Sequence, residues 1–195
     1  MNLVNTNAGV LPQIVASGRI MLATMVICCL LYTLVILGVG QALTPHTANG
    51  SLVHSAQGVI IGSESLAQGF IRPEYFWPRP SAVDYNASAT GGSNLSPTNP
   101  ELRSRANNLI IKMGVTGKEK IPADLVTTSG SGMDPHITLR AAEYQAGRVA
   151  STRGLSVNTV TGILSKCAIK PGGALTPEPL VNVFLVNLAL DRLGK

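Results

Sequence analysis

One uninterrupted apolar segment near the amino terminus constrains this chain more than any other feature. Residues 20–39 read IMLATMVICCLLYTLVILGV, and no Asp, Glu, Lys or Arg occurs between Arg19 and Glu64. About 20 such residues cross the roughly 30 Å hydrocarbon layer of a bilayer as a single helix. We therefore predict a transmembrane helix over residues 19–42, preceded by a short cytoplasmic segment, residues 1–18.

A cleaved signal peptide is the main alternative, because Gly40 and Ala42 are small residues of the kind found at cleavage sites. A signal has an apolar core of about 7–15 residues after a basic region, whereas this core is longer and follows a mostly neutral stretch. The length favours a retained anchor. Arg19 and the amino terminus supply the positive charge on one flank, which predicts that residues 43–195 lie outside the cytoplasm.

Beyond the span, the sequence predicts a linker and one domain. Residues 43–57 contain the breakers Pro45 and Gly50 and show no apolar periodicity, which is typical of a linker. Residues 58–195 are long enough to bury one core of their own. Cys167 is the only cysteine among them, so no disulfide can form within the domain.

Strand, loop and helix signals alternate through this domain, which predicts a mixed α/β (α+β) fold. GVIIG at 58–62 is expected to form a buried strand, and residues 181–193 are expected to begin as a buried strand and then lose regularity. Residues 70–100 are rich in Pro, Gly, Ser, Thr and Asn but hold most of the aromatic residues. Such apolar anchors predict a long ordered loop, and long ordered loops tend to bind partners.

Three helices are expected from capping signals. Asn99 or Thr98 is expected to cap a helix that begins at Pro100 and ends at Gly114. Asp134 is expected to cap a helix that begins at Pro135 and stops at Gly154. A third helix is expected to follow the cap Ser156 and to reach Cys167.

The charge pattern argues against a nucleic-acid-binding protein. The net charge of +5 is modest, and the densest basic stretch, residues 103–120, is broken by Glu119, follows Glu101 and has almost no aromatic residues. Nucleic-acid binding usually needs a concentrated basic face. No HExxH or CxxC motif suggests a metal site either.

The stretch TTSGSGMDPH at 127–136 contains the residue types of a nucleophilic hydrolase, Ser131, Asp134 and His136. The pattern around Ser131 is SGSG, not the GxSxG of a nucleophile elbow, and triad members usually come from distant parts of a chain. A glycine-rich turn before a capped helix explains the stretch more simply. An anchored serine hydrolase, and an anion-binding protein that uses this turn, remain as alternatives.

Four stretches taken together resemble the C subunit of the Kdp potassium-transporting ATPase. They are RPEYFWPRPSAVDYNASATGGSNLSPTNP at 72–100, DLVTTSGSGMDPHIT at 124–138, AAEYQAGRVASTRGL at 141–155 and VNVFLVNLALD at 181–191. Each stretch alone is degenerate, but their order and spacing make coincidence an inadequate explanation. With the preceding span, the resemblance covers the chain after residue 18.

The resemblance implies an accessory subunit of a bacterial inner-membrane complex that takes up K⁺ at the expense of ATP. The implied partners are a channel-like subunit that carries the ion pathway, a P-type ATPase subunit that hydrolyses ATP, and membrane lipid. No cofactor, metal or catalytic residue is assigned to this chain, since ATP and K⁺ are used by the complex. Its implied roles are to stabilise the assembly and to act as a catalytic chaperone that promotes nucleotide binding.

The residues of these stretches that we expect to serve docking or structural roles combine polar side chains, glycines and prolines. They are Arg79, Pro80, Ser81, Tyr85, Asn86, Gly91, Gly92, Ser93, Asn94, Asn99, Ser129, Gly130, Ser131, Gly132, Asp134, Pro135, His136, Gln145, Arg148, Asn182, Asn187 and Asp191. An outer domain cannot touch cytoplasmic ATP, and no phosphate-binding loop occurs. We therefore expect assembly and docking, with any effect on nucleotide binding being indirect.

Overall fold

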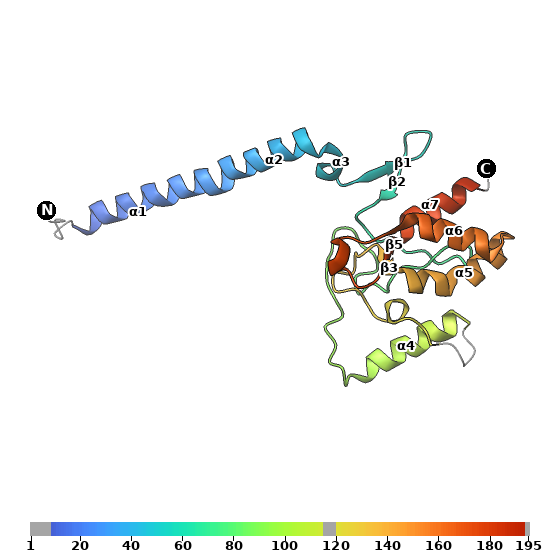
Figure 1. Ribbon diagram of the computed structural model, residues 1–195. Helices are drawn as coiled ribbons and strands as arrows, with labels where there is room; N and C mark the ends of the chain where they lie inside the picture. The colour runs from blue at the N-terminus through green and yellow to red at the C-terminus, as the bar shows by residue number, and fades with distance from the viewer. Residues whose placement is uncertain (1–8, 115–119, 194–195) are drawn as a thin grey trace. The chain divides into compact units, whose positions relative to one another are not determined.

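The computed structural model describes residues 9–114 and 120–193 and divides into two units, residues 1–51 and 52–195. In the first unit, α1 (Val10–Met25), a π-helical segment η1 (Val26–Leu31) and α2 (Tyr32–Leu43) form one helix (Figure 1). Its 34 residues span about 51 Å, which is long and apolar enough to cross a membrane. The helix begins well before the predicted span, and residues 1–8 of the predicted cytoplasmic segment lie outside the described residues.

The segment after this helix is more regular than a linker. One helical turn, α3 (Pro45–Ala48), follows directly. The side chains of Gln41 and Asn49 donate to each other, with N–O distances of 3.2 and 3.1 Å, and the Asn49 side chain also donates to the Pro45 carbonyl at 2.7 Å. These bonds hold α3 at the end of α2, so the predicted linker contains one ordered helical turn despite the breaker Pro45.

The second unit begins with a two-stranded antiparallel hairpin, β1 (Leu52–His54) and β2 (Ile60–Ser63). The strand predicted at 58–62 exists, but the prediction that it is buried was wrong. Ile60 is 56% exposed, and among the described residues this sheet has two strands only, β1 and β2. Only its inner end, at Ser63, is buried.

The core of the domain is built on a small sheet with the strand order β3–β5–β4. β3 (His136–Thr138) and β4 (Ala168–Ile169) both pair antiparallel with the central strand β5 (Leu180–Asn182). The mixed fold class is confirmed. The sheet joins two segments of the chain that are far apart in sequence.

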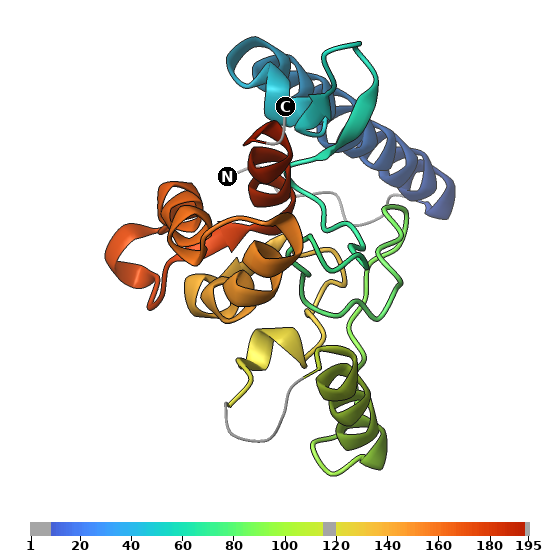
Figure 2. The same cartoon turned by 90° about the vertical axis from the view of Figure 1, so that its right-hand side faces the viewer.

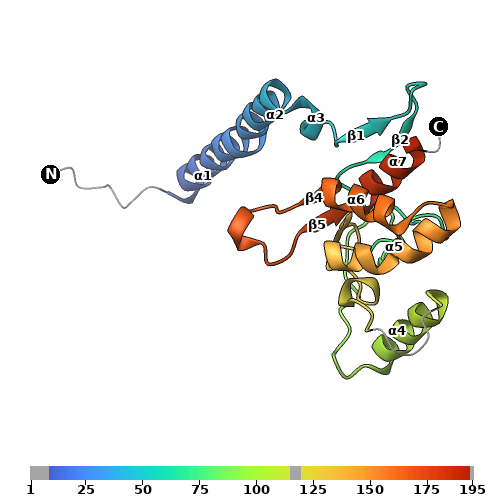
Figure 3. The same ribbon diagram turned by 45° about the vertical axis from the view of Figure 1, so that its right-hand side comes forward.

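Three helices, α5 (Leu139–Arg153), α6 (Val157–Cys167) and α7 (Val183–Leu193), gather around β4 and β5 (Figure 3). The buried face of α5 is mostly alanine, and small side chains let helices approach closely. The largest fully buried apolar side chains of the domain are Phe76, Leu125, Ile137, Leu164, Leu190, Val149, Val160, Val181, Val183 and Val186.

Two further pieces complete the described domain. α4 (Pro100–Lys112) stands apart from the other helices (Figure 2) and buries none of its residues. Short 3-10 turns occur at η2 (Ala123–Leu125) and η3 (Gly173–Leu175). Residues 115–119, part of the basic stretch 103–120, lie outside the described residues.

Several predicted helix ends are confirmed. The Asn99 side chain accepts a hydrogen bond from the Glu101 N–H at 2.8 Å, and Ser156 accepts one from the Thr159 N–H at 3.0 Å. Gly154 ends α5 in the left-handed conformation, with φ of 65°. These signals are local in sequence, so they do not depend on the rest of the fold.

The prediction that Asp134 caps a helix was wrong. Residues 136–138 form β3, because they pair with β5, and the helix starts only at Leu139. Thr138 is the actual cap, and its side chain accepts from the Ala141 N–H at 3.2 Å.

Residues 181–193 also differ from expectation, because the short strand is followed by α7 rather than by irregular structure. The Asn182 side chain accepts from the Leu185 N–H at 3.2 Å, as an N-cap does. Val183, Val186, Asn187 and Leu190 are buried, which is the i, i+3, i+4, i+7 spacing of one helix face.

Candidate docking site

Two buried amide side chains hold the long loop against the helices of the domain. The Asn187 side chain of α7 accepts from the Phe76 N–H at 2.8 Å and donates to the Phe76 carbonyl at 3.0 Å. The Gln145 side chain of α5 accepts from the Trp77 N–H at 2.8 Å and donates to the Trp77 carbonyl at 3.1 Å. Each amide satisfies both backbone groups of one loop residue, as a neighbouring strand would.

Arg148 fixes the loop from the same helix. Its Nη1 donates to the carbonyls of Tyr75, at 3.0 Å, and of Pro73, while its Nη2 donates to the Gln145 Oε1 at 2.7 Å. The guanidinium also lies 4.1 Å from the centre of the Trp77 ring, within cation–π range. Burial lowers the pKa of Arg148 to about 10, which leaves it charged at neutral pH.

An ion pair between α5 and α7 holds the preceding residues of the loop. Arg153 Nη2 lies 2.7 Å from Asp191 Oδ1, and Arg153 Nε donates to the Glu74 carbonyl at 2.7 Å. The Tyr75 hydroxyl donates to Asp191 Oδ2 at 3.2 Å. Residues 73–77 are therefore fixed by side chains from both helices.

The second half of the loop folds around Ser81. Its hydroxyl donates to the Gly132 carbonyl at 2.7 Å and accepts from the N–H groups of Val83, at 3.2 Å, and Tyr85, at 3.0 Å. Asp84 and Tyr85 both have positive φ, 51° and 57°. Such values cost non-glycine residues energy, and they persist only where surrounding contacts impose them.

The Tyr85 ring is held in place at this bend. Its hydroxyl donates to the Arg79 carbonyl at 3.0 Å. Burial, together with the charge of Asp84, raises the pKa of Tyr85 above its ordinary value, so the phenol stays protonated at neutral pH.

The glycine-rich turn lies directly against this half of the loop. The Ser131 carbonyl accepts from the Gly91 N–H at 2.8 Å and from the Thr90 hydroxyl at 3.0 Å, and the Ser129 N–H donates to the Pro80 carbonyl at 3.1 Å. Gly132 has a φ of 71°, and a Cβ there would lie 2.6 Å from a Val83 methyl group. Glycine is therefore required at this contact.

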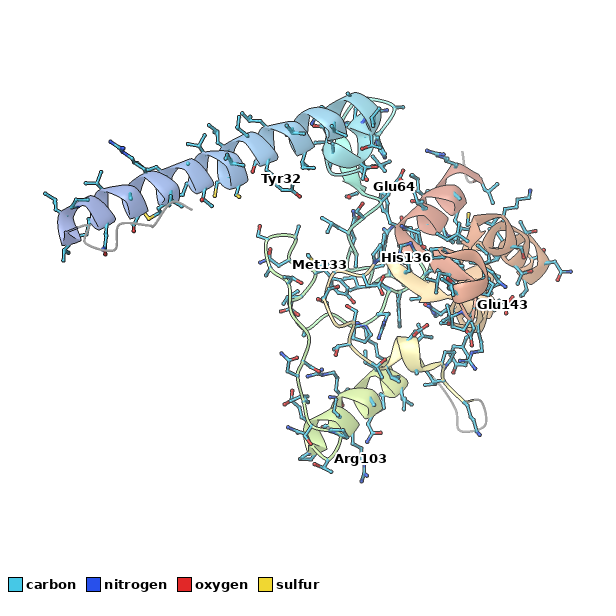
Figure 4. The ribbon with its side chains drawn as sticks, turned by 60° about the vertical axis from the view of Figure 1, so that its left-hand side comes forward. Tyr32, Glu64, Arg103, Met133, His136 and Glu143 are labelled. Atoms are coloured by element: carbon cyan, nitrogen blue, oxygen red, sulfur yellow. The ribbon has the colours of Figure 1, made fainter. Side chains whose placement is uncertain are left out.

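Asp134 joins the turn to the start of β3, where Figure 4 labels Met133 and His136. Its Oδ1 accepts from the His136 N–H at 3.0 Å and lies 3.4 Å from His136 Nδ1, while its Oδ2 lies 3.7 Å from Arg79 Nη1. Burial acts to raise the pKa of Asp134, but the hydrogen bonds from His136 and the charge of Arg79 outweigh it and lower the pKa.

The hydroxyl of Ser131 makes its hydrogen bond within the glycine-rich turn. It accepts from the Met133 N–H at 3.2 Å, whereas the contacts of His136 are with Asp134. A hydrolase would need Ser131 to donate to the histidine, as the nucleophile does to its base. The described geometry instead fits the predicted scaffold role of these residues.

Comparison with known proteins decides the family. The family described as "K+-transporting ATPase, c chain" matches residues 14–192. The potassium-transporting ATPase KdpC subunit of Parvibaculum lavamentivorans is 48% identical over 183 residues, which cover 94% of this chain and 98% of that protein. The KdpC subunit of Shewanella putrefaciens is 42% identical over 182 residues, or 91% and 90%. This chain belongs to the KdpC family.

The structure of this KdpC-family chain brings most of the predicted residues into two connected clusters. The first surrounds residues 73–77 and contains Gln145, Arg148, Asn187 and Asp191. The second joins the loop to the glycine-rich turn. It contains Arg79, Pro80, Ser81, Tyr85, Gly91, Gly92, Ser93, Ser129, Gly130, Ser131, Gly132, Asp134 and His136. The carbonyl of Pro135 instead accepts from the Val183 N–H at the start of α7, at 3.0 Å.

Four other predicted residues lie away from these contacts. Asn86 and Asn94 are exposed on the loop, and Asn94 has a positive φ of 50°. Asn99 caps α4, and Asn182 caps α7 and donates to the Glu64 carbonyl at 2.7 Å. These side chains shape the KdpC domain without joining the two clusters.

Sequence reasoning missed Arg153, which fixes Glu74 and Asp191. No local pattern pointed to Arg153, because its partners, the Glu74 carbonyl and Asp191, are 79 and 38 positions away in the sequence. In residues 9–114 and 120–193 of this KdpC-family chain, no three His, Cys, Asp or Glu side chains are grouped to hold a metal ion.

Proposed function

We propose that this chain is a non-catalytic accessory subunit of a high-affinity, ATP-driven K⁺ uptake complex, and that it stabilises the assembly by docking. Membership of the KdpC family supports a subunit of a K⁺-transporting ATPase. The partners we propose are the channel-like subunit and the P-type catalytic subunit of the same complex. We call residues 79–94 the docking loop.

The observation that carries this proposal is the way the docking loop is held. Its base is fixed to the glycine-rich turn, because Arg79 donates to the Thr128 carbonyl at 3.2 Å and Ser81 donates to the Gly132 carbonyl at 2.7 Å. The loop contains three non-glycine residues with positive φ, Asp84, Tyr85 and Asn94. Gln145 and Arg148 hold the residues that directly precede it. Fixing a loop before binding reduces the entropy that association must overcome. Its tip, residues 86–88, is exposed and carries no part of the core. A rigid loop with a free tip is suited to bind a partner protein.

The proposed arrangement in the membrane follows from the long apolar helix. One helix crosses the bacterial inner membrane, the amino terminus lies in the cytoplasm, and the domain lies outside. Arg19 supports this orientation. In that position the docking loop cannot reach ATP, so any chaperone-like effect on nucleotide binding is transmitted through the partner subunits.

The test adds charge and bulk at the exposed tip. Ala87→Arg is expected to reduce co-purification with the other subunits and to reduce K⁺-stimulated ATPase activity. Asn158→Arg adds the same side chain on the exposed part of α6 and is the matched control. Equal yields of complex for both variants, with both chains folded, would contradict docking through this loop.

A further inference from the structure

The β1–β2 hairpin ends in an exposed apolar tip. Val59, Ile60 and Ile61 are 62%, 56% and 39% exposed. Successive side chains of a strand point to opposite faces, so Ile60 and Ile61 lie on different faces of the hairpin. Apolar side chains therefore occur on both faces of the hairpin, beside the polar turn residues Ser55 and Gln57. In Figures 1 and 3 the connecting turn projects beyond the body of the domain.

The base of the same hairpin is firmly held. A Cβ on Gly62 would lie 2.7 Å from the Phe184 ring of α7, so only glycine permits this contact without a shift. Ser63 is buried, and the Asn182 side chain donates to the Glu64 carbonyl at 2.7 Å. The base of the hairpin is therefore held against the domain, whereas residues 59–61 remain exposed.

The hairpin also begins where the membrane-crossing helix ends. Asn49 is bonded to Gln41 at the end of α2, and the Ser51 N–H donates to the His46 carbonyl of α3 at 2.9 Å. Leu52, the first residue of β1, is the next residue of the chain. At about 3.3 Å per residue, the turn that starts at Ser55 lies within roughly 13 Å of Ser51.

The charge pattern identifies what the tip contacts. The hairpin lies within the same stretch, between Arg19 and Glu64, that has no Asp, Glu, Lys or Arg. A protein partner that adds a strand would find an edge only three or four residues long, which offers few backbone hydrogen bonds. Docking on another protein would also use one face, whereas the tip is apolar on both. The tip has apolar side chains on both faces and lacks Asp, Glu, Lys and Arg, and its polar residues are His54, Ser55 and Gln57. This mixture fits the interfacial region of a bilayer.

We propose that the tip of the β1–β2 hairpin, residues 59–61, inserts into the interfacial region of the membrane leaflet at which α2 ends. This gives the domain a second, peripheral lipid contact beside its helical anchor. The inference rests on the proposed membrane anchoring, and it is independent of the docking loop.

The test measures where residue 60 lies in a bilayer. The full-length chain, with Cys28, Cys29 and Cys167 replaced by serine, carries Ile60→Cys labelled with an environment-sensitive fluorophore. It is reconstituted in vesicles of phosphatidylcholine and phosphatidylglycerol. Ile111→Cys on α4 is the control, because Ile111 is 76% exposed but lies outside the uncharged stretch. Val59→Cys provides a second position on the tip.

Aqueous iodide is expected to quench the label at residue 60 or 59 several-fold less than the label at 111. Lipid that carries a nitroxide near the headgroup is expected to quench only the tip labels. Equal iodide quenching at 60, 59 and 111 in chains that float with the vesicles would overturn the inference and leave the anchor standing. Shielding of residue 60 only when the other subunits are present would also overturn it, in favour of a protein contact. Chains that fail to float would refute the anchoring itself.

Discussion

Replacing Asn187 with alanine tests how the long loop is held. Asn187 is 1% exposed and satisfies both the N–H and the carbonyl of Phe76, at 2.8 and 3.0 Å. An unsatisfied buried backbone group costs about 1–3 kcal/mol, and Asn187→Ala leaves two of them. We expect the free energy of unfolding to fall by about 3 kcal/mol. For a domain of this size that lowers Tm by roughly 10 °C, at about 3 °C per kcal/mol.

The assay is thermal and denaturant unfolding of the full-length chain in detergent, followed by near-UV circular dichroism of the aromatic residues. Asn158→Ala is the matched control, since Asn158 is exposed on α6, and it should change stability by less than about 0.5 kcal/mol. Asn187→Leu fills the volume without the hydrogen bonds and should behave like the alanine variant. A loss below about 1 kcal/mol in both Asn187 variants would refute the reasoning.

Two further predictions concern the glycine-rich turn. Gly132→Ala should destabilise the domain by about 2 kcal/mol, because a left-handed φ and a close Val83 oppose any Cβ, whereas Gly130→Ala, where a Cβ meets nothing within 4 Å, should be nearly neutral in the same unfolding assay. Asp134→Asn should lower stability at neutral pH. Since folding lowers the pKa of Asp134, its contribution is fully present above the unfolded pKa of about 3.9 and is lost as pH falls through the folded pKa. Wild-type and variant stabilities should therefore converge in acid, and a difference that does not change with pH would contradict this ionisation.

Local sequence signals predicted the parts of the fold that local contacts determine. Asn99, Ser156 and Gly154 act within one helical turn, so their roles could be identified without any knowledge of the tertiary structure. The apolar segment was likewise recognisable by itself, because about 20 apolar residues suffice to cross a bilayer, although the helix extends further, from Val10 to Leu43. The ordered loop was predicted from its aromatic residues, which do pack or stack against the domain.

Long-range contacts explain the errors. Asp134 looked like a helix cap, but the pairing of 136–138 with 180–182 turned the next three residues into a strand. The β-branched residues 181 and 183 predicted a buried strand that then loses regularity, but the strand ends at Asn182 and α7 follows it, with the Asn182 side chain accepting from the Leu185 N–H. The two amide pairs at Phe76 and Trp77 join residues 68 and 111 positions apart. No local pattern could have revealed them.

The most direct test of the central claim is site-specific photocross-linking in the intact complex. A photoreactive amino acid at position 87, on the tip of the docking loop, is predicted to form a covalent adduct with the channel-like or the ATP-hydrolysing subunit. The same amino acid at position 158 on α6 is the control. An adduct at 87 and none at 158 is the expected result. Failure of position 87 to cross-link, in a complex that transports K⁺ normally, would contradict the proposal that this loop holds the assembly together.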